Sequence, residues 1–309
     1  MPRLLLVIAA MVALSAPLFA QSPTWQPAPG RVTLNLWPHG APSAAANSAP
    51  EVDTTNAKDD LIAGKRVTRL GNVSTPTLTV YAPPGTNTGA SVVVFPGGGY
   101  HILAIDLEGT EVCYWLNSVG ITCVLVKYRV PDSGPYPKSS AALQDAQRAL
   151  GIVRSHASEW HIDPHRIGIL GFSAGAHLAA ALSTHFEQRL YEPIDSADRV
   201  GCRPDFALII YPGYLAIEEQ NFAPNPEIHV TGQTSPAFIV QAEDDPVHVE
   251  NSIVYFQALK NANVPAEMHL YAHGGHGYGL RRTELSVTAW PKLAETWLQT
   301  IHVLDTSQH

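Results

Sequence analysis

The sequence predicts an α/β fold in which a mostly parallel central sheet is covered by helices on both faces. Short apolar runs alternate with segments of helical periodicity along most of the 309 residues, as is typical of buried parallel strands joined by helices. Hydrophobic residues make up 45% of the chain and charged residues 15%, which is enough apolar material for the core of one large domain.

The strands are expected where β-branched and aromatic residues form short runs closed by Pro or Gly, and the helices where apolar residues recur every three to four positions. The expected strands are Val32–Trp37, Leu78–Tyr81, Val92–Phe95, Thr122–Tyr128, Arg166–Leu170, Phe206–Tyr211, Phe238–Gln241 and Glu267–Tyr271. The expected helices are Glu108–Ser118, Ser139–His156, Ala174–Thr184, Val249–Asn261 and Thr288–Ile301. No repeat or linker divides the chain, so we expect one catalytic domain over residues 61–309, preceded by an extended segment over residues 21–60.

The N-terminus has the pattern of a signal peptide over residues 1–20. Arg3 supplies a positive charge, Leu4–Leu14 is an apolar run too short to span a bilayer, and Ser15–Ala20 offers small residues for cleavage after Ala20. The sequence therefore predicts a secreted or periplasmic protein.

Charge and cysteine content narrow the possible partners. The formal net charge of −8 disfavours nucleic acid and anionic membranes as partners. The three cysteines cannot all pair within one chain; a disulfide between Cys113 and Cys123 is possible, but buried free thiols are favoured. Their spacing does not fit a zinc site, and the sequence carries no indication of oligomeric state.

The strongest local motif is Gly171-Phe172-Ser173-Ala174-Gly175, which follows an apolar run and precedes an Ala-rich helix. This strand–turn–helix context is the one that a G-x-S-x-G nucleophile elbow requires. A sharp turn raises the Ser173 hydroxyl above the sheet, and the helix that follows directs free N–H groups toward developing negative charge. We therefore expect Ser173 to be a nucleophile.

Candidates for a base and an orienting acid follow in the order nucleophile, acid, histidine. Asp244 and Asp245 come directly after the expected strand Phe238–Gln241, and the Gly-rich stretch that holds His273 and His276 follows the next strand. His276 is favoured over His273 because Gly275 and Gly277 flank it and leave its loop free to direct the imidazole. Both aspartates remain candidates for the acid.

The stretch Pro96-Gly97-Gly98-Gly99-Tyr100 follows the strand Val92–Phe95. Three glycines allow the backbone to approach a substrate carbonyl closely and to direct N–H groups at it. The expected oxyanion donors are the amides of Gly98 or Gly99 together with that of Ala174, the residue after the nucleophile.

These motifs together resemble the α/β-hydrolase esterases, and more narrowly the bacterial acetyl xylan and feruloyl esterases and acetyl esterase/lipase-like proteins. The resemblance runs from about residue 75 to 300. It implies Ser173 as nucleophile, Asp245 as acid and His276 as base, with Gly98, Gly99 and Ala174 as oxyanion donors. The chain departs from the family pattern at one point: relatives often have a proline after the run Asp244–Val247, where this chain has His248. This departure leaves either Asp244 or Asp245 as the acid, and Asp245 is favoured.

The resemblance implies an exported serine carboxylesterase that forms an acyl-enzyme and needs no cofactor or metal. Its expected substrates are short-chain esters, acetyl or feruloyl, on small molecules or on acetylated or feruloylated plant polysaccharide. Tyr100, His101, Asp106 and Glu108 are expected to supply polar groups near the leaving alcohol. The long insertions His185–Pro204 and Pro212–Pro236 are expected to lie over the active site as lids or binding loops, with Tyr191, Tyr214 and Phe222 available to stack on sugars.

A general short-chain esterase or a serine peptidase with the same triad is the alternative interpretation. A catalytically silent binding protein is disfavoured by the complete set of Ser, Asp, His and Gly residues.

Overall fold

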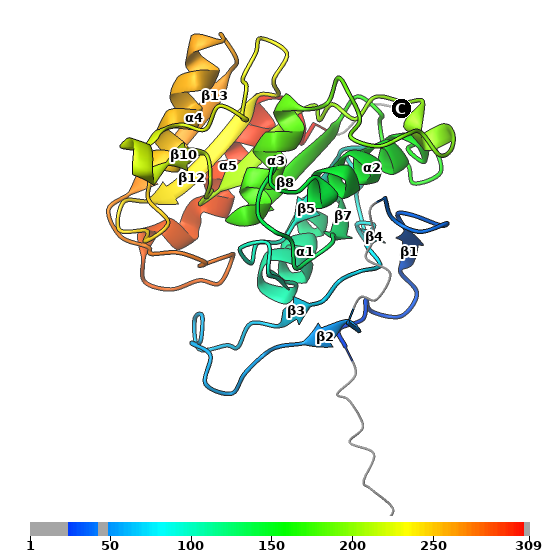
Figure 1. Ribbon diagram of the computed structural model, residues 1–309, viewed down its shortest axis with the longest axis horizontal. Helices are drawn as coiled ribbons and strands as arrows, with labels where there is room; N and C mark the ends of the chain where they lie inside the picture. The colour runs from blue at the N-terminus through cyan, green and yellow to red at the C-terminus, as the bar shows by residue number, and fades with distance from the viewer. Residues whose placement is uncertain (1–23, 43–48, 306–309) are drawn as a thin grey trace, which may run out of the picture.

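Apolar runs without polar interruption form the centre of the sheet in the computed structural model, which describes residues 24–42 and 49–305 (Figure 1). Every residue of β5 (Ser91–Phe95), β8 (Ile167–Phe172), β9 (Ala207–Ile210) and β12 (Ala237–Ala242) is buried. A strand with both sides buried needs layers on both faces, as the sequence predicted. The predicted signal peptide, residues 1–20, lies outside the described residues.

In the described part of the chain, eight strands form one sheet in the order β1–β4–β7–β5–β8–β9–β12–β13. The remaining members are β1 (Val32–Asn35), β4 (Thr77–Tyr81), β7 (Thr122–Lys127) and β13 (Ala266–Tyr271). From β7 to β13 all neighbours pair in parallel, while β4 pairs antiparallel with both β1 and β7. The α/β class and all eight predicted strands are confirmed.

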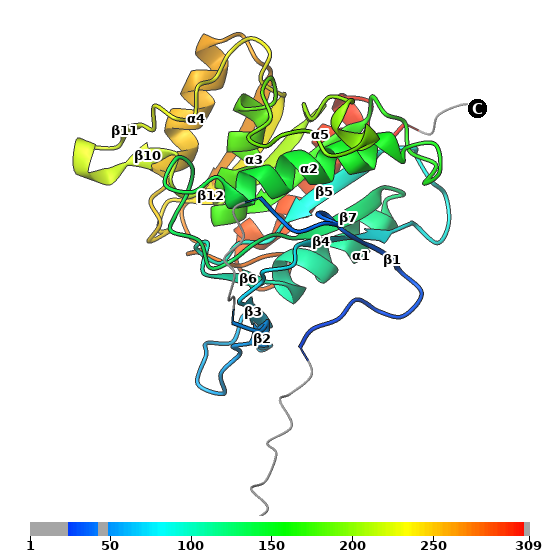
Figure 2. The ribbon, with the colours of Figure 1, turned by 45° about the vertical axis from the view of Figure 1, so that its right-hand side comes forward.

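Helices cover the two faces. In Figures 1 and 2, α2 (Ala141–Ser155) and α3 (Ala174–Thr184) lie side by side on one face, with α4 (Glu250–Asn261) on the same side. On the other face α1 (Glu111–Ser118) packs against α5 (Trp290–Thr300) through Trp115 and Trp290, whose ring centroids are 5.4 Å apart. No helix among the described residues has both the length and the apolar character needed to cross a membrane.

A second, three-stranded sheet was not predicted. β2 (Val52–Asp53), β3 (Arg69–Gly71) and β6 (Ile102–Ala104) pair antiparallel in that order, below the central sheet in Figures 1 and 2. Strands of two or three residues are too short to show an alternating pattern, so only their pairing with distant residues defines them. The two-residue strands β10 (Ala216–Ile217) and β11 (Ala223–Pro224) escaped prediction for the same reason.

The cysteines correct one expectation. Cys113 on α1 and Cys123 on β7 form a disulfide, with Cα atoms 5.1 Å apart, and Cys202 is buried and free. The preference for free thiols was wrong because α1 packs directly on β7 and brings both side chains to bonding distance, which their separation in sequence does not reveal.

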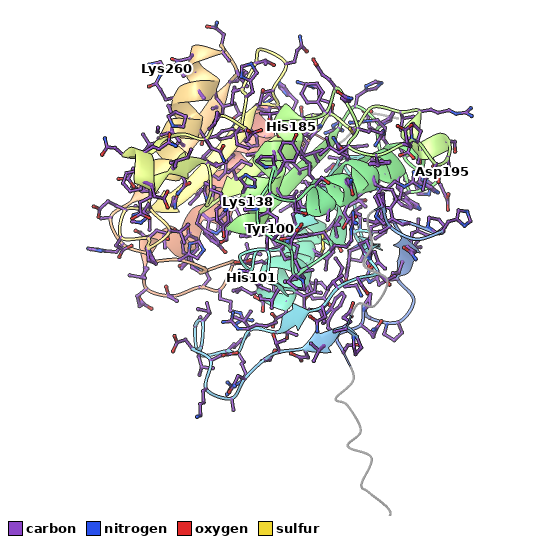
Figure 3. The ribbon with its side chains drawn as sticks, in the orientation of Figure 1. Tyr100, His101, Lys138, His185, Asp195 and Lys260 are labelled. Carbon is purple, nitrogen blue, oxygen red and sulfur yellow. A yellow bond between two sulfur atoms is a disulfide. The ribbon has the colours of Figure 1, made fainter. Side chains whose placement is uncertain are left out.

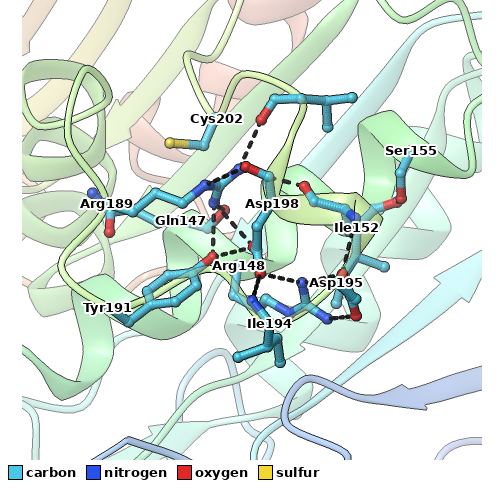
Figure 4. A network of polar contacts seen from close by, with 12 residues as sticks. Gln147, Arg148, Ile152, Ser155, Arg189, Tyr191, Ile194, Asp195, Asp198 and Cys202 are labelled. Atoms are coloured by element: carbon cyan, nitrogen blue, oxygen red, sulfur yellow. Dashed lines mark hydrogen bonds and ion pairs between the residues drawn. The ribbon is translucent and has the colours of Figure 1, made fainter.

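The insertion of residues 185–204 is a structural element. Arg148 on α2 is almost fully buried and forms ion pairs with Asp195 and Asp198 of the insertion (Figure 4). Tyr191 donates a hydrogen bond of 2.7 Å to Asp198 and packs edge-on against Trp37, so its ring is not available to stack on a sugar. A buried guanidinium requires such partners, and the insertion supplies them.

Candidate active site

The turn between β8 and α3 holds Ser173 in a strained conformation, with φ 52° and ψ −118°. The glycines of the motif allow α3 to approach β5 and β8 closely. A Cβ added to Gly175 would lie 2.1 Å from the Phe95 carbonyl oxygen, and one on Gly171 would lie 2.0 Å from the Gly175 carbonyl oxygen. The small residues are therefore needed so that α3 can begin directly above the edge of the sheet.

A continuous chain of hydrogen bonds joins Ser173, His276 and Asp245. His276 Nε2 lies 2.8 Å from Ser173 Oγ, and His276 Nδ1 lies 2.9 Å from Asp245 Oδ2. Because a carboxylate only accepts hydrogen bonds, Nδ1 donates to Asp245 and Nε2 is left to accept from the Ser173 hydroxyl. Asp245 is 4% exposed and also accepts from the Val247 amide at 2.7 Å and from Gln241 at 3.0 Å.

Asp244 and His273 form a separate, exposed pair. Asp244 Oδ2 lies 3.3 Å from His273 Nδ1, and the other oxygen accepts from the amides of Gly274 and Gly275 at 2.9 and 2.8 Å. The Gly275 amide, followed by that of Gly274 and by His273, holds the pKa of Asp244 below its usual value. Asp244 therefore braces the loop that carries His276 and does not contact the His276 imidazole.

Three amides close to the nucleophile are free to bind a substrate. Gly98 and Gly99 lie in the same cavity as Ser173, and Ala174 is the first residue of α3. Among the described residues, none of these three N–H groups has a hydrogen-bond acceptor. The loop that holds the glycines continues through Tyr100 and His101 toward β6 (Figure 3). The geometry suits an oxyanion hole, in which free donors surround the position where negative charge develops.

Glu108 connects the glycine loop with the histidine loop. It is 3% exposed, lies in the π-helical turn η1 (Asp106–Thr110), and accepts from the Gly97 amide at 2.7 Å and from the Tyr211 hydroxyl at 2.8 Å. The Tyr211 oxygen in turn accepts from the Gly279 amide at 3.1 Å, and its ring packs against His276. Burial raises the pKa of Glu108. Sequence reasoning missed this role because Gly97 lies 11 residues and Tyr211 lies 103 residues from Glu108 in the sequence.

His177 lies on α3 one turn after Ser173 and takes no part in the chain of hydrogen bonds. Its Nδ1 lies 2.8 Å from the Tyr100 hydroxyl, and burial lowers its pKa to about 3. At neutral pH His177 is therefore uncharged and packs beneath the glycine loop with Tyr100.

A cavity of about 370 Å³ opens at the nucleophile. Besides Ser173, His276 and the two glycines, residues 60–69 and the segment from Ile102 to Glu108 contribute to its wall; no residue of either predicted insertion does. Residues 212–236 nevertheless begin beside the elbow, since the Gly213 amide lies 3.5 Å from the Ser173 carbonyl oxygen.

The polar groups of this cavity agree only in part with those expected: Glu108 contributes to its wall, while Tyr100, His101 and Asp106 do not. Tyr100 is buried against His177, while Asp106 accepts from the Thr68 amide at 2.8 Å and pairs with Arg281. Asp60 and Arg69, which the sequence did not single out, contribute to the cavity instead.

Comparison with known proteins places the chain in a family. The family model described as alpha/beta hydrolase fold matches residues 92–230, and that of the prolyl oligopeptidase family matches residues 206–300. The solved structure of an acetyl ester-xyloside bifunctional hydrolase from Caldicellulosiruptor lactoaceticus is 38% identical, with 76% of this chain and 91% of that chain covered and a TM-score of 0.67. The chain belongs to the α/β-hydrolase family.

Two further relatives of this α/β-hydrolase have names that refer to xylan. It is 33% identical over 221 residues to an acetylxylan esterase from Xylanibacter ruminicola, covering 63% of this chain and 42% of the relative. It is 29% identical over 211 residues to endo-1,4-beta-xylanase B from Butyrivibrio fibrisolvens, covering 62% of this chain and 33% of the relative. The hydrolase thus spans less than half the length of both relatives.

Proposed function

We propose that this α/β-hydrolase is a serine carboxylesterase that removes acetyl groups, and with lower efficiency feruloyl groups, from xylan-type polysaccharide. The chain of hydrogen bonds from Asp245 through His276 to Ser173 carries the proposal, since this arrangement activates a serine hydroxyl. The similarity to an acetylxylan esterase and to an acetyl ester-xyloside hydrolase supports the choice of substrate.

The reaction proceeds in two steps. His276 Nε2 takes the Ser173 proton as the oxygen attacks the ester carbonyl, and the resulting oxyanion accepts hydrogen bonds from the amides of Gly98, Gly99 and Ala174. The tetrahedral intermediate expels the alcohol, which receives the proton from His276. A water molecule, deprotonated by His276, then attacks the acyl-enzyme, and the second tetrahedral intermediate releases acetate as His276 returns the proton to Ser173 Oγ. Asp245 holds the imidazole in the required tautomer and stabilises its cation.

One observation favours a second candidate, a serine peptidase. The prolyl oligopeptidase family model matches residues 206–300, the part of the chain that contains Asp245 and His276. The same triad cleaves amides as well as esters, so only the choice of substrate separates the two functions.

A substrate panel on the purified protein tests the proposal. We expect the highest kcat/KM on nitrophenyl acetate, a fall of about tenfold or more from acetate to hexanoate, acetate release from acetylated xylan, and slow turnover of methyl ferulate. Ser173→Ala removes the nucleophile and should lower turnover by about 10⁴- to 10⁶-fold in a folded protein. Cleavage of prolyl peptides without ester turnover would establish the peptidase instead, and a preference for long acyl chains would contradict an acetyl esterase.

We further propose that the protein is exported and cleaved after Ala20. The residues before Ala20 have the composition of a signal peptide, and the Cys113–Cys123 disulfide suits an oxidising compartment. Mass spectrometry of protein recovered from the periplasm or the medium of an expressing bacterium should find a chain that begins at Gln21. Uncleaved protein confined to the cytoplasm, with both thiols reduced, would contradict export.

A further inference from the structure

Residues 60–69 form one wall of the cavity at Ser173, although they lie outside residues 92–230, which the α/β-hydrolase model matches. Asp60, Ile62, Val67 and Arg69 contribute to this wall. The same cavity is lined by Gly98, Gly99 and His276. A substrate bound at Ser173 therefore has to contact this segment.

The wall is tied to the rest of the molecule. Arg281 is 8% exposed and donates to the carbonyl oxygens of Lys65 and Arg66 at 2.9 and 3.0 Å. The same guanidinium forms an ion pair of 2.8 Å with Glu111 at the start of α1. One buried side chain thus joins the wall to a helix of the central fold, and so holds it at a defined distance from the nucleophile.

Backbone contacts complete the attachment. Arg69 on β3 pairs with Ala104 on β6, and the Ile105 amide donates to the Thr68 carbonyl oxygen at 3.1 Å. Because β6 follows directly from the loop that holds Gly98 and Gly99, the wall and the oxyanion loop share one small sheet.

The cavity has an apolar base. Val67, Ala104 and Leu107 are buried and form a small cluster of their own, with Ile62 packed against it. An apolar, enclosed surface of this size suits a short acyl chain, which loses little by leaving water.

The rim is polar and open. Asp60 is exposed, and its side chain has no hydrogen-bond or ion-pair partner among the described residues. The Arg69 side chain is 38% exposed; its Nε donates to Asp59 at 3.2 Å, while its two terminal nitrogens have no acceptor in the described part of the chain. A carboxylate that only accepts and a guanidinium that only donates together can bind neighbouring hydroxyl groups.

We infer that residues 60–69 are the substrate-binding wall, in which Val67 contacts the acyl methyl group and Asp60 and Arg69 hydrogen-bond the hydroxyls of the sugar that carries the ester. The inference rests on the proposed function, because it assumes a carbohydrate ester. A polymeric alcohol is too large for a cavity of about 370 Å³ and therefore has to occupy its exposed side, where Asp60 and the terminal nitrogens of Arg69 lie. The two-carbon acyl group then occupies the base.

The test compares two substrates that share an acetyl group. We would measure kcat/KM on acetylated xylo-oligosaccharides and on nitrophenyl acetate for the full chain, for Asp60→Ala and for Arg69→Gln. The ratio of the two values, sugar ester over nitrophenyl ester, should fall at least about tenfold in each variant, because a hydrogen bond to a charged group is lost only with the sugar. Lys58→Ala, which alters an exposed residue two positions before this segment that does not line the cavity, should keep the wild-type ratio.

The outcomes separate the two proposals. The inference is overturned if both Asp60→Ala and Arg69→Gln keep the wild-type ratio to within about twofold. In that case, acetate release from the oligosaccharides by the wild type still supports the proposed function. If the wild type cleaves nitrophenyl acetate but releases no acetate from the oligosaccharides, the proposed carbohydrate esterase function fails, and the inference with it. Asp60→Ala is expected to fold normally, since the Asp60 side chain has no partner among the described residues to lose. Arg69→Lys should restore part of the ratio of sugar-ester to nitrophenyl-ester kcat/KM.

Discussion

Two histidine–carboxylate pairs lie on the same two loops, only one residue apart at the carboxylate and three at the histidine. Asp245 and His276 are joined at 2.9 Å, and Asp244 and His273 at 3.3 Å. Asp245 is buried and its imidazole partner reaches Ser173, whereas 77% of the His273 side chain is exposed and it contacts no nucleophile. The chemistry of the two pairs is the same, so their surroundings decide what each can do.

Support from neighbouring groups makes the difference. Asp245 accepts two hydrogen bonds besides that of His276, and the Tyr211 ring packs against the His276 imidazole. Buried partners fix an imidazole in one orientation, while an exposed pair gains little from its charges because water screens them. A histidine next to a carboxylate is therefore a common feature, and a histidine held in place by a buried carboxylate is the rarer one.

The largest effect on activity in this comparison is expected from breaking the buried pair. Asp245→Asn and His276→Ala should each lower kcat/KM on nitrophenyl acetate by at least about 10³-fold, because the serine then lacks an oriented base. Steady-state kinetics on folded variants, checked by circular dichroism, provide the measurement.

The exposed pair supplies the matched control. Asp244→Asn and His273→Ala should cost about tenfold or less, since they loosen the loop without touching the imidazole of His276. A larger loss in Asp244→Asn than in Asp245→Asn would mean that Asp244 is the orienting acid and that the loop moves when substrate binds.

An effect between these two is expected from Glu108, which holds both catalytic loops without contacting the serine hydroxyl. Glu108→Gln retains the shape but satisfies only one of the two donors, so kcat should fall by about 10- to 100-fold with little change in KM. Separate measurement of kcat and KM, beside a thermal unfolding curve, distinguishes a displaced oxyanion loop from a loss of folded protein. Glu187→Gln alters an exposed glutamate whose side chain has no partner among the residues that the structure describes, so it should behave as wild type. An unchanged kcat in Glu108→Gln would show that Gly97 does not need this anchor.

Local patterns in the sequence were sufficient for much of the fold. Eight strands were recognised from runs of β-branched and aromatic residues, and the elbow at Ser173 from glycines that a close approach of Phe95 requires. These features depend on residues within a few positions of one another, and the periodicity of a strand or the sterics of a turn acts at that range. The order of nucleophile, acid and histidine along the chain belongs to the same kind of information.

Only the tertiary structure decided which of these residues meet. Arg281 reaches Lys65 across 216 residues, Glu108 reaches Tyr211 across 103, and the Cys113–Cys123 bond depends on how α1 lies on β7. The wall of residues 60–69 was hidden for the same reason, since β3, in which it ends, is too short to show a pattern and exists through pairing with β6. Contacts of this kind follow from the order of strands in the sheet and from the packing of layers, which no short stretch of sequence contains.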